Sequence, residues 1–170
     1  MTKDKSGTSA EDFFPDRKSI KAFREAAADC EACDLWKRGT QTVFGEGARH
    51  AEIVFVGEQP GNEEDLSGKP FVGPAGRLLD EALAQAGIDR AQTYVTNVVK
   101  HFKWEPRGKR RIHKNQTPAK LLPAVHGSKQ RLALVKPKVI VCLRRHCGSG
   151  IARAKIQSQQ TTRTIHWNPL

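Results

Sequence analysis

The stretch Ala51-Glu-Ile-Val-Phe-Val-Gly-Glu-Gln-Pro-Gly61 decides the fold class of this chain. Its first six residues form a short apolar, β-branched run, which is typical of a strand buried on both faces of a parallel sheet. Turn residues begin at Gly57, and residues 63–65 predict an acidic loop. Residues 93–99 and 136–143 have the same apolar character. Three buried strands are therefore predicted.

A segment whose apolar residues have helical spacing lies between the first two predicted strands. Residues 75–86 carry apolar residues three and four positions apart (Leu78, Leu79, Ala82 and Leu83), and Gly87 follows as a stop signal. A second helical pattern covers residues 19–37, and the polar residues 1–17 before it predict a flexible lead. This alternation predicts an α/β, three-layer sandwich with a mostly parallel central sheet. In such sheets, ligands bind beyond the carboxyl ends of the strands.

Charge is divided unevenly along the 170 residues. Residues 1–105 contain all 18 acidic residues and 14 Lys or Arg, a net of 14 − 18 = −4. Residues 106–170 contain the other 15 Lys or Arg and no acid, a net of +15. A basic half of this kind favours a polyanionic partner such as nucleic acid.

The sequence also indicates a compartment. No apolar run is long enough to span a membrane, and the residues up to Glu11 lack the apolar core of a signal peptide. We expect a cytoplasmic monomer in which cysteines are ligands or free thiols. Cys30 and Cys33 have C-x2-C spacing, which alone leaves zinc, redox and iron–sulfur roles open.

Three motifs follow one another along the chain: Gly57-Glu-Gln-Pro-Gly61, Gly68-Lys-Pro-Phe-Val-Gly-Pro-Ala-Gly-Arg-Leu-Leu-Asp80 and Tyr94-Val-Thr-Asn-Val-Val-Lys100. In this order they resemble the iron–sulfur uracil-DNA glycosylases of family 4. The basic loop Lys109-Arg-Arg-Ile-His113 narrows the resemblance to the UdgX subgroup, which captures uracil-DNA covalently through the histidine of this loop. The resemblance covers about residues 29–118 and implies a DNA-repair enzyme acting on uracil-containing DNA, with single strands preferred.

The chemistry of base removal assigns roles to the motif residues. A stacked uracil must leave the helix before its glycosidic bond can be reached. We expect Phe71 to stack on the base, and Asn97 and Gln59 to bind its polar atoms. The resemblance implies that His113 attacks the sugar carbon, and we choose Glu58 as the carboxylate that stabilises the resulting positive charge.

The resemblance also implies a [4Fe–4S] cluster with Cys30 and Cys33 as ligands and His101 at the third ligand position. No fourth ligand is identifiable, and Cys142 is expected in the core. Close UdgX relatives have Asp where this chain has Asn62, which puts a role for that carboxylate in doubt. Four basic side chains are predicted to contact DNA phosphates: Lys109, Arg110, Arg111 and Lys114.

Two segments depart abruptly from the family pattern, although residues 132–143 between them follow it. In the first, Pro123 and Gly127 would destabilise the helix expected before the third strand. We hypothesise frameshifts near Lys120 and Leu143; the alternative is a divergent basic tail that wraps DNA. The predicted regions are a flexible lead (1–17), a glycosylase-like domain (18–143, with 120–131 anomalous) and a disordered tail (144–170).

The same departures predict an incomplete C-terminus. The family's His-Pro-Ser motif is absent, His166-Trp-Asn-Pro169 is not a substitute, and the last strand and terminal helix are expected to be missing. We therefore expect weak or absent activity. Three functions are weighed: covalent capture of uracil-DNA through His113, ordinary release of free uracil, and non-enzymatic binding of nucleic acid.

Overall fold

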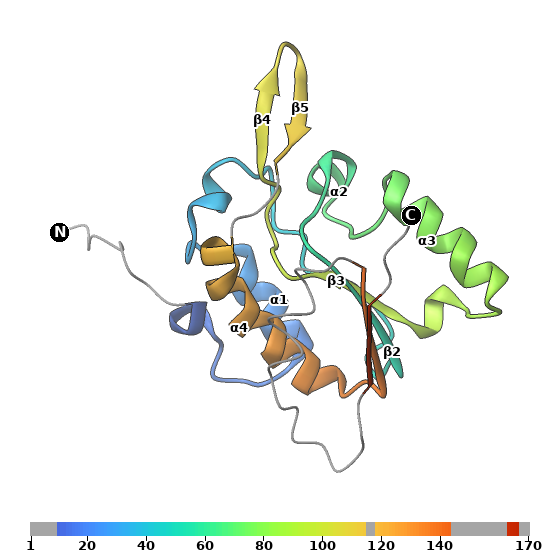
Figure 1. Cartoon of the computed structure of the whole chain (residues 1–170). Helices are drawn as coiled ribbons and strands as arrows, with labels where there is room; N and C mark the ends of the chain where they lie inside the picture. The colour runs from blue at the N-terminus through green and yellow to red at the C-terminus, as the bar shows by residue number, and fades with distance from the viewer. Residues whose placement is uncertain (1–9, 115–117, 144–162, 167–170) are drawn as a thin grey trace.

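The computed structural model describes residues 10–114, 118–143 and 163–166. It is an α/β sandwich around a five-stranded sheet whose strands are parallel except β1 (Figure 1). The predicted α/β class with a mostly parallel sheet is confirmed. The strand order is β1 (Glu46–Gly47), β3 (Tyr94–Asn97), β2 (Ile53–Gly57), β6 (Val139–Cys142) and β7 (Arg163–His166).

Helices cover both faces of the sheet. Along β2, Val54 and Val56 belong to the core on the side of α1 and α4, whereas Phe55 packs with Leu79 and Leu83 of α3. This alternation follows from the period of two in a strand. The helices are α1 (Ile20–Ala28), α2 (Asn62–Ser67), α3 (Pro74–Gln85) and α4 (Pro118–Val135), with short 3-10 turns η1 (Ala10–Phe13), η2 (Asp34–Lys37) and η3 (Arg90–Gln92).

The carboxyl ends of β2 and β3 meet in register, with Gly57 opposite Asn97. A Cβ at Gly57 would lie 2.2 Å from Asn97 Oδ1 and 2.7 Å from the Phe71 ring. Only glycine leaves room for these two side chains to approach each other across the strand end. The sheet therefore brings three of the matched motifs together at one edge.

The basic segment forms a hairpin rather than a loop. Strands β4 (Trp104–Arg107) and β5 (Arg110–His113) pair antiparallel and project from the body of the molecule (Figure 1). Trp104 pairs with His113 at the base of the hairpin. His113 therefore ends the hairpin next to the body.

Two local predictions are wrong. The expected acidic loop at 63–65 is part of α2, because its acids occupy the first turn of a helix, where negative charge is favoured. The helical pattern of residues 19–37 ends at Ala28, and Cys33 instead caps η2. The C-x2-C pair therefore lies in the connection between α1 and η2.

The helix over residues 118–135 is continuous through Pro123 and Gly127, contrary to expectation. Its C-terminal part places Leu132 and Val135 in the core, and this packing outweighs the poor intrinsic propensity of the two helix breakers. Ala10–Phe13, within the expected flexible lead, forms η1 and contacts α4.

In the C-terminal region, the structure describes only residues 163–166 of the predicted tail. Part of the expected disordered tail forms β7, which pairs parallel with β6 and places the backbone of His166 opposite Cys142. The sheet therefore has five strands among the described residues, and the expected absence of the family's last strand and terminal helix stays a prediction. Residues 144–162 and 167–170 lie outside the described residues, and the frameshift hypothesis stays a prediction. In the described ranges, no helix has the length and apolar character needed to cross a bilayer.

Candidate active site at the carboxyl edge of the sheet

A cavity of about 540 Å³ opens at the carboxyl edge of the sheet. It is lined by Glu58, which follows β2, by Phe71 from the loop before α3, by Asn97 at the end of β3, and by His113 at the end of β5. Gln59 lines it as well. The five residues predicted for catalysis and base recognition, which come from four separate segments, thus share one cavity.

Phe71 is held in an unusual backbone conformation. Its φ is +55°, a region that side-chain-bearing residues seldom adopt. The Arg90 guanidinium donates to the Phe71 carbonyl at 3.1 Å, and a Cβ at Gly76 would lie 1.9 Å from that oxygen. Strain of this kind clusters at binding sites, where the surrounding structure enforces it. The fold therefore fixes the direction of this ring.

Glu64 ties together the two loops that form the cavity, although sequence reasoning missed it. Its buried carboxylate accepts from the backbone N–H groups of Gly61 at 3.0 Å, Val72 at 3.0 Å and Gly73 at 2.7 Å. Hydrogen bonds to a charged acceptor are strong. The signal was its place three residues after Gly61, as in a capping box.

Gln59 joins the body to the hairpin. Its Oε1 accepts from the Lys103 N–H at 3.3 Å, and its Nε2 donates to the Lys114 carbonyl at 2.9 Å. The same Nε2 lies 2.7 Å from Nε2 of His113. Gln59 therefore holds both sides of the hairpin base together with the histidine at its end.

Arg111 faces inward, although it was predicted to contact phosphate. Its guanidinium forms an ion pair with Asp65 at 2.7 Å and donates to Asn62 Oδ1 at 2.7 Å. The Asp65 side chain is fully buried, and that of Arg111 is 20% exposed. The guanidinium also lies 5.5 Å from the ring centres of Phe102 and Trp104. Arg111 thus fixes the hairpin to α2, and Asn62 accepts one of its hydrogen bonds.

The other predicted phosphate contacts remain on the surface. Lys109 and Arg110 are exposed at the tip of the hairpin. Lys114 is also exposed, and its ammonium pairs with Glu105. Exposed cations on a projecting hairpin can reach a polyanion without leaving a buried partner.

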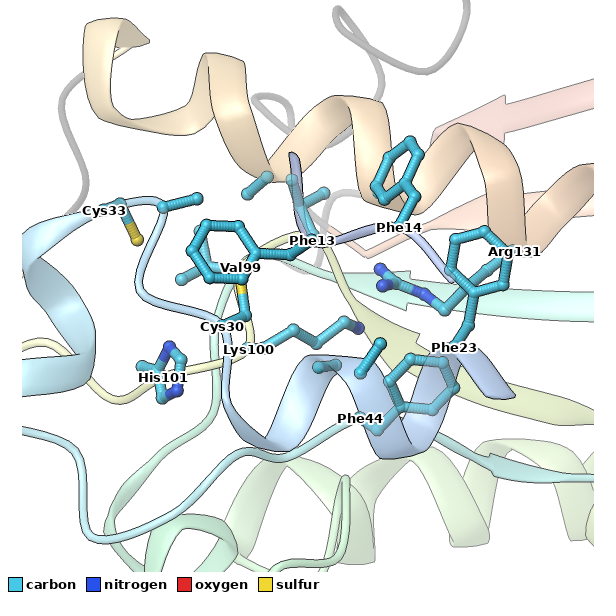
Figure 2. Close-up of a pocket in the computed structure, with 16 residues that line it drawn as sticks. Phe13, Phe14, Phe23, Cys30, Cys33, Phe44, Val99, Lys100, His101 and Arg131 are labelled. Atoms are coloured by element: carbon cyan, nitrogen blue, oxygen red, sulfur yellow. The ribbon is translucent and has the colours of Figure 1, made fainter. Parts of the chain in front are cut away.

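A second cavity, of about 80 Å³, lies on the other face of the sheet, between α1 and α4. We call it the donor cavity because Cys30, Cys33 and His101 line it (Figure 2). Lys100 and Arg131 line it as well, and Figure 2 shows Arg131 on the opposite side from Cys33. Buried cations of this kind suit a negatively charged occupant.

Burial disfavours the charged forms of Lys100 and Arg131. Burial lowers the pKa of Lys100 well below its usual value, and Arg131 and Arg24 lower it further. Burial also lowers the pKa of Arg131 to about 10, although Tyr94 and Cys30 act in the opposite direction. Within the described part of the chain, Arg131 Nε has no hydrogen-bond partner.

The donors fit an iron–sulfur cluster in kind but not in arrangement. Among residues 10–114, 118–143 and 163–166, no three His, Cys, Asp or Glu side chains come close enough to hold a metal ion. His101 Nε2 lies 3.0 Å from Thr42 Oγ1, and its pKa is lowered chiefly by burial. The cavity as folded is therefore not a finished cluster site.

Comparisons with known proteins agree with the geometry at the sheet edge. The family model of the uracil DNA glycosylase superfamily matches residues 44–167. A type-4 uracil-DNA glycosylase of Archaeoglobus fulgidus is 46% identical over 116 residues, which are 68% of this chain and 55% of the relative. One from Thermotoga maritima is 42% identical over 124 residues, 73% of this chain and 61% of the relative. The chain thus spans little more than half the length of these curated relatives.

Proposed function

The chain belongs to the uracil-DNA glycosylase superfamily, and from this premise we propose that it draws uracil out of DNA and attacks the sugar carbon of the glycosidic bond. The observation that carries the proposal is the shared cavity of Glu58, Phe71, Asn97 and His113. A stacking ring, an amide, a carboxylate and an imidazole are the groups that recognition and cleavage of a flipped uracil need.

Each group has a definite task in the proposed reaction. The Phe71 ring stacks on the base, and the Asn97 amide binds the polar edge of the base. Asn97 is only 3% exposed. As the glycosidic C–N bond breaks, its electron pair leaves with uracil and positive charge develops on the sugar carbon. A lone pair of His113 then forms the new N–C bond, and Glu58 stabilises the imidazolium produced.

We propose single-stranded uracil-DNA as the preferred substrate and a monomer as the active form. Extruding a base costs least when it is not already paired and stacked in a duplex. Lys109 and Arg110 at the exposed hairpin tip would contact phosphates near the extruded nucleotide.

The experiment is a search for a covalent adduct. The full chain is incubated with uracil-containing single-stranded DNA and then run on a denaturing gel. We expect a shifted band that His113→Ala abolishes, while the same change at the exposed His50 leaves it intact. No band with folded protein would refute covalent capture.

The names of the relatives favour a second candidate, the ordinary release of free uracil. In that reaction, water attacks the sugar carbon and the enzyme turns over. The same incubation would yield no shifted band, free uracil, and DNA that alkali cleaves at the abasic site. Binding without either product would indicate the third function, a basic nucleic-acid-binding module, with affinity that falls steeply with salt.

A [4Fe–4S] cluster remains part of the proposal, held by Cys30, Cys33 and His101. A bound cluster would stabilise the fold around it. The buried positive charges of Lys100 and Arg131 in the donor cavity favour such a negatively charged group. Anaerobic purification should give brown protein containing iron and sulfide, and Cys30→Ser should remove both. Colourless, iron-free but folded protein would exclude the cluster.

A further inference from the structure

The amide of Gln59 has only one possible orientation. Its oxygen end faces the backbone N–H of Lys103, which can only donate, and its nitrogen end faces the carbonyl of Lys114, which can only accept. Rotating the amide by 180° would place donor against donor and acceptor against acceptor. The backbone of the hairpin base therefore identifies which end of the amide carries the N–H groups.

This orientation determines the protonation of the neighbouring histidine. Gln59 Nε2 lies 2.7 Å from His113 Nε2, so the amide N–H points at that ring nitrogen. A ring nitrogen can accept a hydrogen bond only when it carries a lone pair and no proton. In the neutral ring, the single proton must then be on Nδ1.

We propose that Gln59 is a positioning residue that fixes His113 as the Nδ1-protonated tautomer, with the lone pair of Nε2 held by the Gln59 N–H until reaction. The inference rests on the proposed function for its purpose, because Nε2 is then the nitrogen that forms the bond to the sugar carbon. Nδ1 keeps its proton, and the imidazolium formed balances the negative charge that departs with uracil. No separate base is needed to activate the nucleophile.

The assignment also changes the role expected of Gln59. Its amide hydrogen bonds serve the hairpin base and the histidine. Both N–H groups of the amide are then engaged, so the donor to a uracil carbonyl is left to Asn97. The hydrogen bond from the Gln59 N–H to Nε2 must break as the new N–C bond forms. Until then, the amide keeps a proton from binding to Nε2.

The tautomer can be measured without any activity. In ¹⁵N-histidine-labelled full chain, above about pH 8.5 so that imidazoles are neutral, we expect the His113 Nε2 resonance to be that of an unprotonated nitrogen and Nδ1 that of a protonated one. His113→Gln identifies the signals by their loss. An Nε2-protonated tautomer in folded protein would overturn the proposal.

The Gln59→Glu variant tests whether the amide of Gln59 sets the tautomer of His113. In Gln59→Glu, a carboxylate can accept but not donate, so the proton should move to Nε2 and the rate of adduct formation should fall at least tenfold. Gln92→Glu, on an exposed position of η3, makes the same change in charge and should leave both unchanged. An unaltered tautomer in folded Gln59→Glu would refute the role of the amide. If the wild-type tautomer is as expected and no adduct forms, the proposed function fails and the positioning role survives.

Discussion

The cavity at the sheet edge and the donor cavity differ in how their charges are compensated. At the edge, backbone N–H groups of two loops donate to the Glu64 carboxylate, and the Arg111 cation pairs with Asp65. In the donor cavity, the described lining includes the cations of Lys100 and Arg131 and no carboxylate. Each network leaves one guanidinium nitrogen without a hydrogen-bond partner among the described residues, Arg111 Nη2 at the edge and Arg131 Nε in the donor cavity. The difference is therefore one of charge: the edge cation has a carboxylate partner, whereas the donor cavity lacks a negative one.

The largest effect is expected where the edge network is most deeply buried. Asp65→Asn leaves the Arg111 guanidinium without its charge partner, and removing one member of a buried ion pair costs about 3 kcal/mol or more. We expect the free energy of unfolding to fall by about 3 kcal/mol in chemical denaturation, and the yield of adduct to fall with it because the hairpin loosens.

Asp80→Asn is the matched control, because Asp80 forms its ion pair with Arg90 on the surface, with half of its side chain exposed. Its cost should stay within about 1 kcal/mol. Equal losses in the two variants would mean that Asp65 and Arg111 do not hold the hairpin, and the contrast between the two cavities would lose its physical basis.

The second test makes one substitution in each cavity. Phe71→Leu removes the stacking ring, and base–aromatic stacking is worth about 1–3 kcal/mol, so affinity for uracil-DNA should fall about tenfold or more. Phe13→Leu, in the donor cavity, should leave that affinity unchanged. Fluorescence anisotropy with uracil and thymine strands measures both. An equal loss for both variants would show that Phe71 acts through stability rather than contact.

The sequence predicted the edge cavity far better than the hairpin and the donor cavity. Strands that end in Gly57 and Asn97 must bring their following residues together, because parallel strands share one carboxyl edge. The inward role of Arg111 could not be read from a run of basic residues, since its partner Asp65 lies 46 positions away. Helix α4 was misjudged because Pro123 and Gly127 oppose it locally while distant core contacts favour it.

The third test concerns the missing negative partner of the donor cavity. Arg131→Met keeps most of the volume and removes a buried charge, and such replacements are often neutral or stabilising by about 1 kcal/mol or more. We expect the free energy of unfolding of iron-free protein to be unchanged or about 1 kcal/mol higher. Arg49→Met, at an exposed position before β2, serves as control. A loss above about 2 kcal/mol would show that Arg131 is already well paired.

The last comparison concerns Cys142, which is buried in the core on the side of α1 and α4. Burial raises the pKa of its thiol to about 11 from an ordinary 9.0. Above pH 9 the unfolded chain therefore loses this proton while the folded chain keeps it, and stability falls as pH rises through that window. Cys142→Ala should remove a slope of at most about 1.4 kcal/mol per pH unit.

Val141→Ala truncates the same strand without removing a titrating group, so it should keep the alkaline slope while lowering stability throughout. The comparison uses the slope between pH 9 and 11 in chemical denaturation rather than absolute stability, which separates loss of packing from loss of the thiol. If Cys142→Ala and wild type show the same slope, the thiol titrates alike in both states and is open to water. Strand β7, which pairs with β6, would then not protect the Cys142 thiol from solvent.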